Sequence, residues 1–362
     1  MNRMHFFLTL MCIGLAGSTA QWFMYRTAYS FLRPFWTVIL FFIPILAFIG
    51  VNVNPTALPL VLTRFLAWLG GLSFAFFYYS VLLLLVFLLA LLAGKVTGTN
   101  PAPQVSRYGF WLILLLLVAG AWRATHPVVR EESFITAKAG ANPYKIVFVS
   151  DLHLGGLFGS SYANELVAKI NAQKPELILL GGDLIDGSLE LVEKEGSYQA
   201  FKNLQATDGV YAVNGNHDIF GGSNAQERAL LTKQGITFLT NQTQSIGAKI
   251  VLNGLDDYSR GGKIFLSPAL AKQQLNIFLE HQPRHIEQAA AAGYDLYFAG
   301  HTHAGQFYPN RLITKRMYTL DYGSKYFAQM LATVSAGYGL WGIPIRIGPA
   351  PEIVVVNVEG KQ

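Results

Sequence analysis

Carboxylates, imidazoles and one carboxamide recur along the second half of this chain, each time directly after a short apolar run. They are Asp151 and His153 after VFVS, Asp183 and Asp186 after LLGG, Asn216, His217 and Asp218 after VYAVNG, His281 after IFLE, and His301 and His303 after YFAG. Each group alone fits a turn or a helix cap. Nothing in folding, however, requires five strands to end in such residues. Because ligand sites assemble at the carboxyl ends of strands in α/β sheets, we expect one site built from all five.

This mixture of side chains indicates a metal site. Carboxylates, imidazoles and a neutral amide oxygen together suit borderline divalent ions such as Mn²⁺, Fe²⁺ or Zn²⁺, whereas an all-oxygen set would favour Mg²⁺ or Ca²⁺. The candidate ligands are numerous enough for two ions. Two ions about 3.5 to 4 Å apart can share a carboxylate and a hydroxide, lower the pKa of that water and clamp the oxygens around phosphorus. The pattern therefore predicts hydrolysis of a phosphate ester or anhydride.

The elements that must position these residues follow an α/β pattern. Short β-rich runs are YKIVFVS, ELILLGG, GVYAVNG, KIVLNGL, LNIFLE and LYFAG, and helix-like segments between some of them are SSYANELVAKINAQK and PALAKQQL. The segments LATVSAGYGL and PEIVVVNV predict closing strands. Periodicity alone predicts an α/β fold.

The ordered motifs DxH, GDxxD, GNHD, a lone His and GHxH resemble those of the calcineurin-like metallophosphoesterases. In this sequence they are SDLHLG, GGDLIDG, NGNHD, FLEHQP and FAGHTHAGQ, and the resemblance covers about the last 220 residues. VNGLDDY and VSAGYGLWGIPIRIGPAPEI also resemble the bacterial, membrane-attached branch of this family. The resemblance implies two packed mixed β-sheets flanked by helices.

The resemblance also implies a role for each position. One metal ion would be held by Asp151, His153 and His303, the other by Asn216, His281 and His301, with Asp183 bridging the two. A hydroxide between the ions would attack phosphorus in line. His217 would protonate or stabilise the leaving oxygen, with Asp218 orienting its imidazole.

Several neighbouring residues have roles that the motifs leave open. His285 competes with His281 as a ligand, but we prefer His281 because it ends a strand, whereas His285 begins the segment RHIEQAAAAG, which resembles a helix. Asp186 is expected to hold hydrogen bonds outside the metal ligands, and Gly215 to permit a tight turn. Arg260 and Arg284 could contact phosphate, although solvated surface positions suit both.

Composition predicts a membrane region ahead of this domain. The 362 residues are 52% hydrophobic and 13% charged, which is more apolar than is usual for a soluble domain. Four apolar stretches, each near or above the length that crosses a bilayer, lie at Phe6 to Met24, Pro34 to Val53, Phe65 to Ala93 and Tyr108 to Trp122. The first also resembles a cleavable signal peptide. The flanking Lys and Arg divide evenly between the two sides, so the side of the membrane on which the domain lies stays open.

We therefore expect a transmembrane region of about four helices over residues 1–124, a linker over 125–142 and a metallophosphoesterase domain over 143–362, in a multi-pass protein of the cell (inner) membrane. The net charge of +6 is dispersed, so nucleic acid is not an expected partner, and the single cysteine, Cys12, excludes a disulfide framework or a cysteine nucleophile.

Three hypotheses of function follow. The first is a metal-dependent phosphohydrolase acting at the bilayer on a phosphodiester or pyrophosphate of a lipid or lipid-linked substrate. A sharper form is a pyrophosphohydrolase of a nucleotide-linked acylated sugar in lipid A synthesis, an activity that some family members have. The third is a membrane scaffold or sensor with a structural metal site, which would have no use for His217 and Asp218 beside the ligands.

Overall fold

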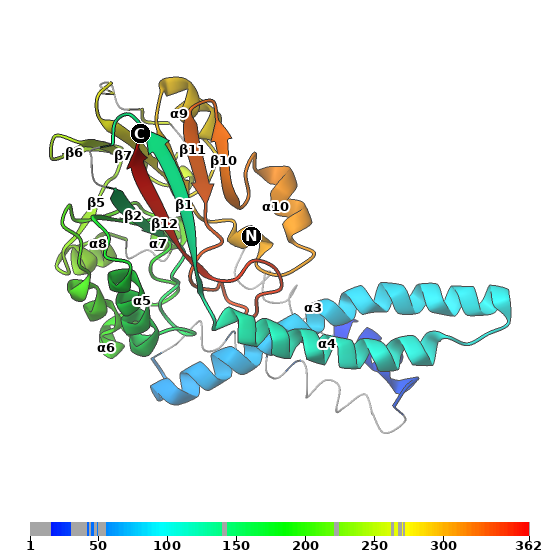
Figure 1. The fold of residues 1–362 in the computed structure, drawn as a ribbon. Coiled ribbons are helices and arrows are strands. Elements are labelled where there is room, and N and C mark those ends of the chain that lie inside the picture. Colours follow the sequence, from blue (N-terminus) through cyan, green and yellow to red (C-terminus); the bar gives the residue numbers. More distant parts are fainter. Residues whose placement is uncertain are drawn as a thin grey trace. The chain divides into compact units, whose positions relative to one another are not determined.

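The chain forms two compact units, which we describe separately. One comprises Met1–Trp122 with Gly342–Ile345, and the other Arg123–Trp341 with Arg346–Gln362. The computed structural model describes residues 16–29, 42, 45, 46, 49, 56–139, 143–220, 224–261, 264–266, 270 and 272–361. Figure 1 shows the chain coloured along its sequence.

The first unit contains two described helices long and apolar enough to cross a membrane, α3 (Leu60–Thr97) and α4 (Ala102–Ala124). They coincide with the third and fourth predicted spans. Four spans were predicted, and the described residues yield only these two. Residues 16–26 are helical and overlap the end of the first predicted span, but the rest of that span and most of the second lie outside the described residues.

The second unit is built on two six-stranded mixed sheets. In spatial order the first sheet contains β1 (Val128–Thr136), β12 (Glu352–Gly360), β2 (Tyr144–Val149), β3 (Leu177–Leu180), β4 (Val210–Ala212) and β5 (Ile236–Phe238). The second contains β10 (Gly323–Phe327), β11 (Met330–Val334), β9 (Leu296–Ala299), β8 (Leu275–Leu279), β7 (Ile250–Gly254) and β6 (Gln242–Ile246). The pair of mixed sheets implied by the family resemblance is confirmed.

The two sheets pack face to face over one apolar core. Ile146 and Phe148 of the first sheet and Ile277 and Phe298 of the second belong to the same buried cluster. The alternate residues of β2, such as Val147, are buried as well. A strand apolar on both faces must be covered on both faces, which explains the continuous apolar runs in the sequence.

Helices accompany the sheets. They are α5 (Ser160–Ala172), α6 (Leu189–Glu195), α7 (Asn216–Phe220), α8 (Asn224–Thr232), α9 (Ile286–Ala292) and α10 (Arg311–Met317), with short 3₁₀ turns η1 (Ser197–Asn203), η2 (Tyr258–Arg260) and η3 (His303–Gly305). α5 buries Ala163, Leu166, Val167 and Ile170, the spacing of one helical face. The predicted helix-like segment PALAKQQL spans residues 268–275, of which 270 and 272–275 are described. Residues 272–274 form a turn and Leu275 begins β8, so the described part of this segment is not helical.

The predicted linker over 125–142 is wrong in part. Residues Val128–Thr136 form β1, which pairs in parallel with β12 along its whole length. Only one of its nine side chains, that of Phe134, is buried, because β1 lies at the sheet edge. An edge strand with charged, exposed side chains has the polar composition of a linker, and so its sequence did not distinguish the two.

Candidate metal centre

The predicted ligands all follow the carboxyl ends of parallel strands. β2, β3 and β4 are parallel neighbours in the first sheet, and β8 and β9 are parallel neighbours in the second. The residues after these ends meet in two compact groups: Asp151, His153 and His303 in one, and Asp183, His281 and His301 in the other. Within each group one potential ligand atom per residue lies within 4.8 Å of the others.

In the first group imidazole nitrogens face each other directly. His153 Nε2 lies 3.1 Å from His303 Nε2, which in turn lies 3.5 Å from Asp151 Oδ1. Because metal–nitrogen bonds are about 2.1 Å long, neighbouring ligands of one ion lie about 3 Å apart. The residues present therefore fit a divalent cation.

The second group converges on His281 Nε2. This atom lies 3.2 Å from Asp183 Oδ2, 3.2 Å from His301 Nδ1 and 3.1 Å from Asn216 Oδ1. The same Asp183 oxygen lies 3.9 Å from His153 Nε2 of the first group. Asp183 thus stands between the groups, where a bridging carboxylate belongs. The structure brings all seven predicted ligands together, and their individual roles stay predictions.

His285, the rejected competitor, serves another purpose. It is the N-cap residue of α9, as its predicted place at the start of a helix required, and its Nδ1 lies 2.7 Å from Glu280 Oε2. That contact holds the imidazole of His285 against Glu280, within its own loop.

The protonation states of the site suit cation binding. Burial lowers the pKa of His301 to about 3 and that of His303 well below its usual value, so both rings keep a free lone pair. Burial opposes ionisation of Asp183, yet His281 lowers the pKa of that carboxyl below its usual range. Asp183 in turn raises the pKa of His281 against the effect of burial.

Second contacts hold three of the imidazoles in place. Nδ1 of His281 lies 2.7 Å from the carbonyl oxygen of Gly181, and Nδ1 of His153 lies 3.5 Å from Asp186 Oδ2. In both rings Nε2 is the nitrogen directed at the site, and such outer acceptors orient metal-binding histidines. Nδ1 of His303 lies 3.3 Å from the guanidinium of Arg346, which can only donate, so this contact differs in kind from the other two.

The backbone at the site is strained. Asp151, His153, Asp183, His301 and His303 have φ angles of 56°, 48°, 52°, 70° and 48°. A non-glycine residue in this left-handed region costs of order 1–3 kcal/mol and persists only where its surroundings impose it. Here the N–H of His301 is held by the carboxylate of Asp151, at 3.0 to 3.1 Å. Such clustering of strain is typical of a functional site.

The predicted pairing of Asp218 with His217 is wrong. His217 Nδ1 lies 3.0 Å from Asp186 Oδ1, so Asp186 orients the imidazole. The carboxylate of Asp218 instead accepts backbone N–H groups, at 2.7 to 3.0 Å, from Asp183, Leu184 and Gly215. Asp218 is therefore a positioning residue that joins the loops after β3 and β4. The expectation that Asp186 holds hydrogen bonds beside the metal ligands agrees with this geometry, although Asp186, His153 and His217 also converge closely enough to hold an ion.

Asp218 has a second buried carboxyl group beside it. Burial, together with the negative charge of Asp218, raises the pKa of Glu227 to about 12, so Glu227 is neutral and donates its proton to Asp218. Glu227 lies in α8 and is 3% exposed. The sequence contained no signal for this pair because eight residues, 219–226, separate Glu227 from the motif.

Glu227→Gln is expected to raise the melting temperature at neutral pH. Glutamine keeps a donor toward Asp218 without having to take up a proton on folding. In the wild type the folded pKa of Glu227 lies above the 4.5 of a free glutamate side chain, so its contribution to the free energy of unfolding is complete below about pH 4.5 and is lost as pH rises. Thermal melts between pH 5 and 9 should give a flatter slope for the variant. An unchanged slope would contradict a neutral Glu227.

Gly215 has a different role from the tight turn that was predicted. It is absent from the residues with positive φ, and a Cβ atom there would lie 2.1 Å from Asp183 Oδ1. Glycine is required because the carboxylate of Asp183 approaches the backbone at this point.

Gly215→Ala is therefore expected to displace Asp183 and to remove nearly all activity, together with much of the bound metal. Gly156→Ala is the matched control, since nothing lies within 4 Å of a Cβ there. Metal content by elemental analysis and turnover of a phosphodiester check both variants. Equal activity of the two variants would show that Asp183 tolerates the shift.

Three residues near the site lie in motifs quoted above but were given no role from the sequence: Gln306, Trp341 and Arg346. Arg346 is fully buried and donates to the carbonyl oxygens of His303, Ala336 and Gly339. Burial lowers its pKa to about 10, which still leaves a cation behind His303 at neutral pH. The side-chain amide of Gln306 donates to the carbonyl oxygen of Trp341 and accepts from its backbone N–H. The indole of Trp341 lies 6.0 Å from the His217 ring, and Trp341 is 58% exposed.

The two arginines considered for phosphate binding differ. Arg260 lies 3.9 Å from Asp256, in a half-exposed ion pair. The guanidinium of Arg284 lies over the rings of Tyr258 and Tyr318, at 4.2 and 5.6 Å, and the Tyr318 ring is 6.0 Å from that of His301. Of the two, Arg284 is the one placed beside the metal centre.

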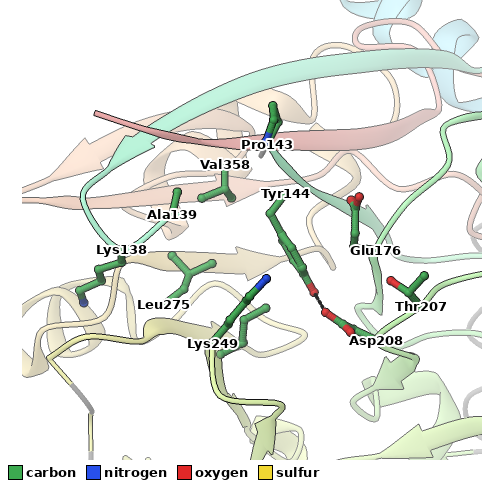
Figure 2. Close-up of a pocket in the computed structure, with 11 residues that line it drawn as sticks. Lys138, Ala139, Pro143, Tyr144, Glu176, Thr207, Asp208, Lys249, Leu275 and Val358 are labelled. Carbon is green, nitrogen blue, oxygen red and sulfur yellow. Dashed lines mark hydrogen bonds between the residues drawn. The ribbon is translucent and has the colours of Figure 1, made fainter. Parts of the chain in front are cut away.

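A separate cavity of about 280 Å³ lies at the opposite ends of the strands. Figure 2 shows Tyr144 donating to Asp208, at 2.6 Å, with Lys249 and Leu275 around them. These residues stand at or before the amino ends of β2, β4, β7 and β8. The cavity is thus separated from the metal centre by the length of the strands.

Comparisons with known proteins agree with this geometry. The family model described as calcineurin-like phosphoesterase matches residues 144–305. A metallophosphoesterase of Helicobacter pylori strain J99 is 31% identical over 311 residues, covering 82% of this chain and 80% of that protein. The chain belongs to the calcineurin-like phosphoesterase family, a group of metal-dependent phosphoester hydrolases.

Two other relatives extend the comparison. The metallophosphoesterase YkuE of Bacillus subtilis is 30% identical, over 61% of this chain and 80% of that protein. A protein of Bos taurus described as a transmembrane protein with metallophosphoesterase domain is 30% identical, over 59% of this chain and 52% of that protein. The family is therefore shared with a protein that is described as transmembrane.

Proposed function

We propose that this chain is a membrane-anchored phosphohydrolase that uses two divalent ions to cleave a phosphodiester or pyrophosphate of a lipid or lipid-linked substrate. The observation that carries the proposal is the place of Asp183 between two groups of ligands, with His217 to one side and held by Asp186. A structural metal site needs no such unliganded acid. Mn²⁺, Fe²⁺ and Zn²⁺ are the candidate ions.

The chain's own residues suggest how the reaction is assisted. Bound divalent ions would supply an activated water and draw negative charge from the phosphoryl oxygens. Since burial is outweighed by the neighbouring imidazoles, the pKa of Asp186 lies below its usual value, and the ionised carboxylate accepts Nδ1–H of His217. Nε2 of His217 is then the atom that gives a proton to the leaving oxygen.

The surroundings of His217 favour a bulky leaving group. The exposed indole of Trp341 stands beside the imidazole, and Gln306 fixes its backbone from both sides. An aromatic face there can contact the organic leaving group of a phosphate ester or pyrophosphate. Arg284, beside His301, is placed to meet a phosphate oxygen.

Membrane attachment supports a lipid-linked substrate. The helices α3 and α4 are each long enough to span a bilayer, and a substrate held in the same membrane would be concentrated at the domain. We place the protein in the cell (inner) membrane as a multi-pass protein. The bilayer and a phosphate-containing lipid are its proposed partners.

The test uses the full-length protein in detergent, stripped with chelator and reloaded with Mn²⁺. Its substrates are bis(p-nitrophenyl) phosphate, p-nitrophenyl phosphate, extracted membrane phospholipids and a nucleotide-linked acylated sugar. We expect metal-dependent turnover of the diester above that of the monoester, and release of a phosphorylated headgroup or of a nucleotide identifies the lipid substrate. If the protein binds metal but hydrolyses none of the four substrates, a scaffold with a structural metal site is favoured.

A further inference from the structure

Helix α10 presents an exposed face of apolar and basic side chains. Leu312, Ile313 and Met317 are 51%, 59% and 63% exposed, and Lys315 and Arg316 are exposed beside them. We call these five residues the α10 face. The helix contains no acidic residue and no buried one. Exposed apolar side chains that are rimmed by cations mark an interaction surface.

The opposite side of α10 is fixed to the protein. Arg311 Nε lies 3.3 Å from Asp321 Oδ2, and Thr314 Oγ1 donates to the same oxygen at 2.9 Å. Residues three apart share one side of a helix, so this contact turns positions 312, 313, 316 and 317 outward. Lys315, four residues after Arg311, lies at the border of the two sides and is exposed. Figure 1 shows α10, in orange, outside the two sheets.

The same anchor ties α10 to the metal centre. The main-chain oxygen of Asp321 accepts the hydroxyl of Thr302, which stands between His301 and His303. Tyr318, the residue after α10, has its ring 6.0 Å from the ring of His301. The helix that carries the α10 face is therefore connected to the metal centre through one buried aspartate, Asp321.

The chemistry of the face matches a bilayer surface. Interfacial helices place Leu, Ile or Met in the acyl boundary and Lys or Arg among anionic headgroups. Each basic residue near an anionic leaflet strengthens membrane binding about fivefold, and the effects of two such residues multiply. A bilayer is also the partner that the chain itself supplies, since α3 and α4 are long enough to span one and only residues 125–127 separate α4 from β1.

We propose that the α10 face docks on the anionic surface of the membrane that α3 and α4 span, and that it sets the metal centre at headgroup level. The inference rests on the proposed membrane anchorage and deepens it, because a site held at that level receives phosphates of membrane lipids without their extraction from the bilayer.

The first test measures membrane contact in the full chain. Cys12 is replaced by alanine, and single cysteines carry an environment-sensitive fluorophore at Met317→Cys or at Lys249→Cys, an exposed control at the opposite ends of the strands. The protein is reconstituted into phosphatidylcholine vesicles with and without 30% phosphatidylglycerol and with spin-labelled lipids as quenchers. We expect quenching at position 317 that increases with the anionic lipid, and little at position 249.

Charge reversal at Lys315 and Arg316 to glutamate should lower the docking equilibrium constant at least about tenfold. A second variant, Ile313→Asp, should lower turnover of a phosphodiester embedded in the vesicle while turnover of soluble bis(p-nitrophenyl) phosphate is kept. None of these side chains is buried, so both variants should fold.

The outcomes separate this surface from the proposed function. A chain that does not float with vesicles would contradict membrane anchorage and the surface together. A chain that inserts but is quenched equally at positions 317 and 249, or not at all, would overturn the surface alone. Protection of position 317 by an added protein fraction, without lipid, would assign the face to a protein partner and overturn the proposal. If the wild-type protein does not hydrolyse soluble bis(p-nitrophenyl) phosphate, the result counts against the proposed hydrolase function and not against the α10 face.

Discussion

Replacement of His217 by alanine is expected to lower turnover of an alkyl phosphodiester by about 10²- to 10⁴-fold, the usual contribution of a general acid. Bound metal should stay at the wild-type level, because the imidazole of His217 has its polar contact with Asp186 and belongs to neither of the two predicted ligand groups. Steady-state kinetics with elemental analysis of the same sample measures both quantities.

The dependence on the leaving group makes this prediction specific. A p-nitrophenolate leaves readily without a proton, so His217→Ala should cost much less on bis(p-nitrophenyl) phosphate than on an alkyl diester. Asp186→Asn should give an intermediate loss with the same preference, because the amide cannot favour the protonated ring as a carboxylate does. Equal losses on both substrates would show that His217 binds phosphate rather than donating a proton.

The second large effect is expected at Asp183. Asp183→Asn keeps the size of the side chain and an acceptor for the N–H of His217, at 2.8 Å, but it removes the negative charge between the two ligand groups. Loss of an outer partner of a metal ligand already costs 10- to 100-fold in affinity or activity. For a residue placed to bridge, we therefore expect a loss above about a hundredfold, together with weaker binding of at least one ion.

Asp208→Asn is the matched control for Asp183→Asn. Asp208 is also an aspartate engaged by a side chain, Tyr144, but it lies at the opposite ends of the strands. Its replacement should leave metal content and activity unchanged. Wild-type activity in Asp183→Asn would exclude a bridging role.

The fold could be predicted where burial acts on both faces of a strand. The strands β2, β3, β4, β7, β8 and β9 were all indicated by continuous apolar runs, and each is found. The strands β1, β5, β6 and β10 were not predicted, and all four lie at sheet edges. β1 and β6 keep mostly exposed, polar side chains, and β5 has only three residues. Edge strands are fixed by pairing with a distant neighbour, and a local pattern does not contain that information.

The site was predictable in composition but not in its pairings. His217 and Asp218 are adjacent in sequence, which suggested that they pair. They lie in α7, however, and consecutive residues on a helix do not face each other. The partner of His217 comes from the loop after β3, and Asp218 turns to the backbone of that loop and to Glu227. Arg346 was missed for the same reason, since it reaches His303 from 43 residues further along the chain.

The most direct test of the two-ion hydrolase is to follow activity against bound metal. Full-length protein, stripped of metal and kept in detergent, is titrated with Mn²⁺ while bound ions per chain and turnover of bis(p-nitrophenyl) phosphate are measured in the same samples. We predict that turnover rises with metal and reaches its maximum at two ions per chain, and that Asp183→Asn does not reach it. A protein that binds two ions and hydrolyses neither this diester nor a pyrophosphate or membrane lipid would contradict the proposed function.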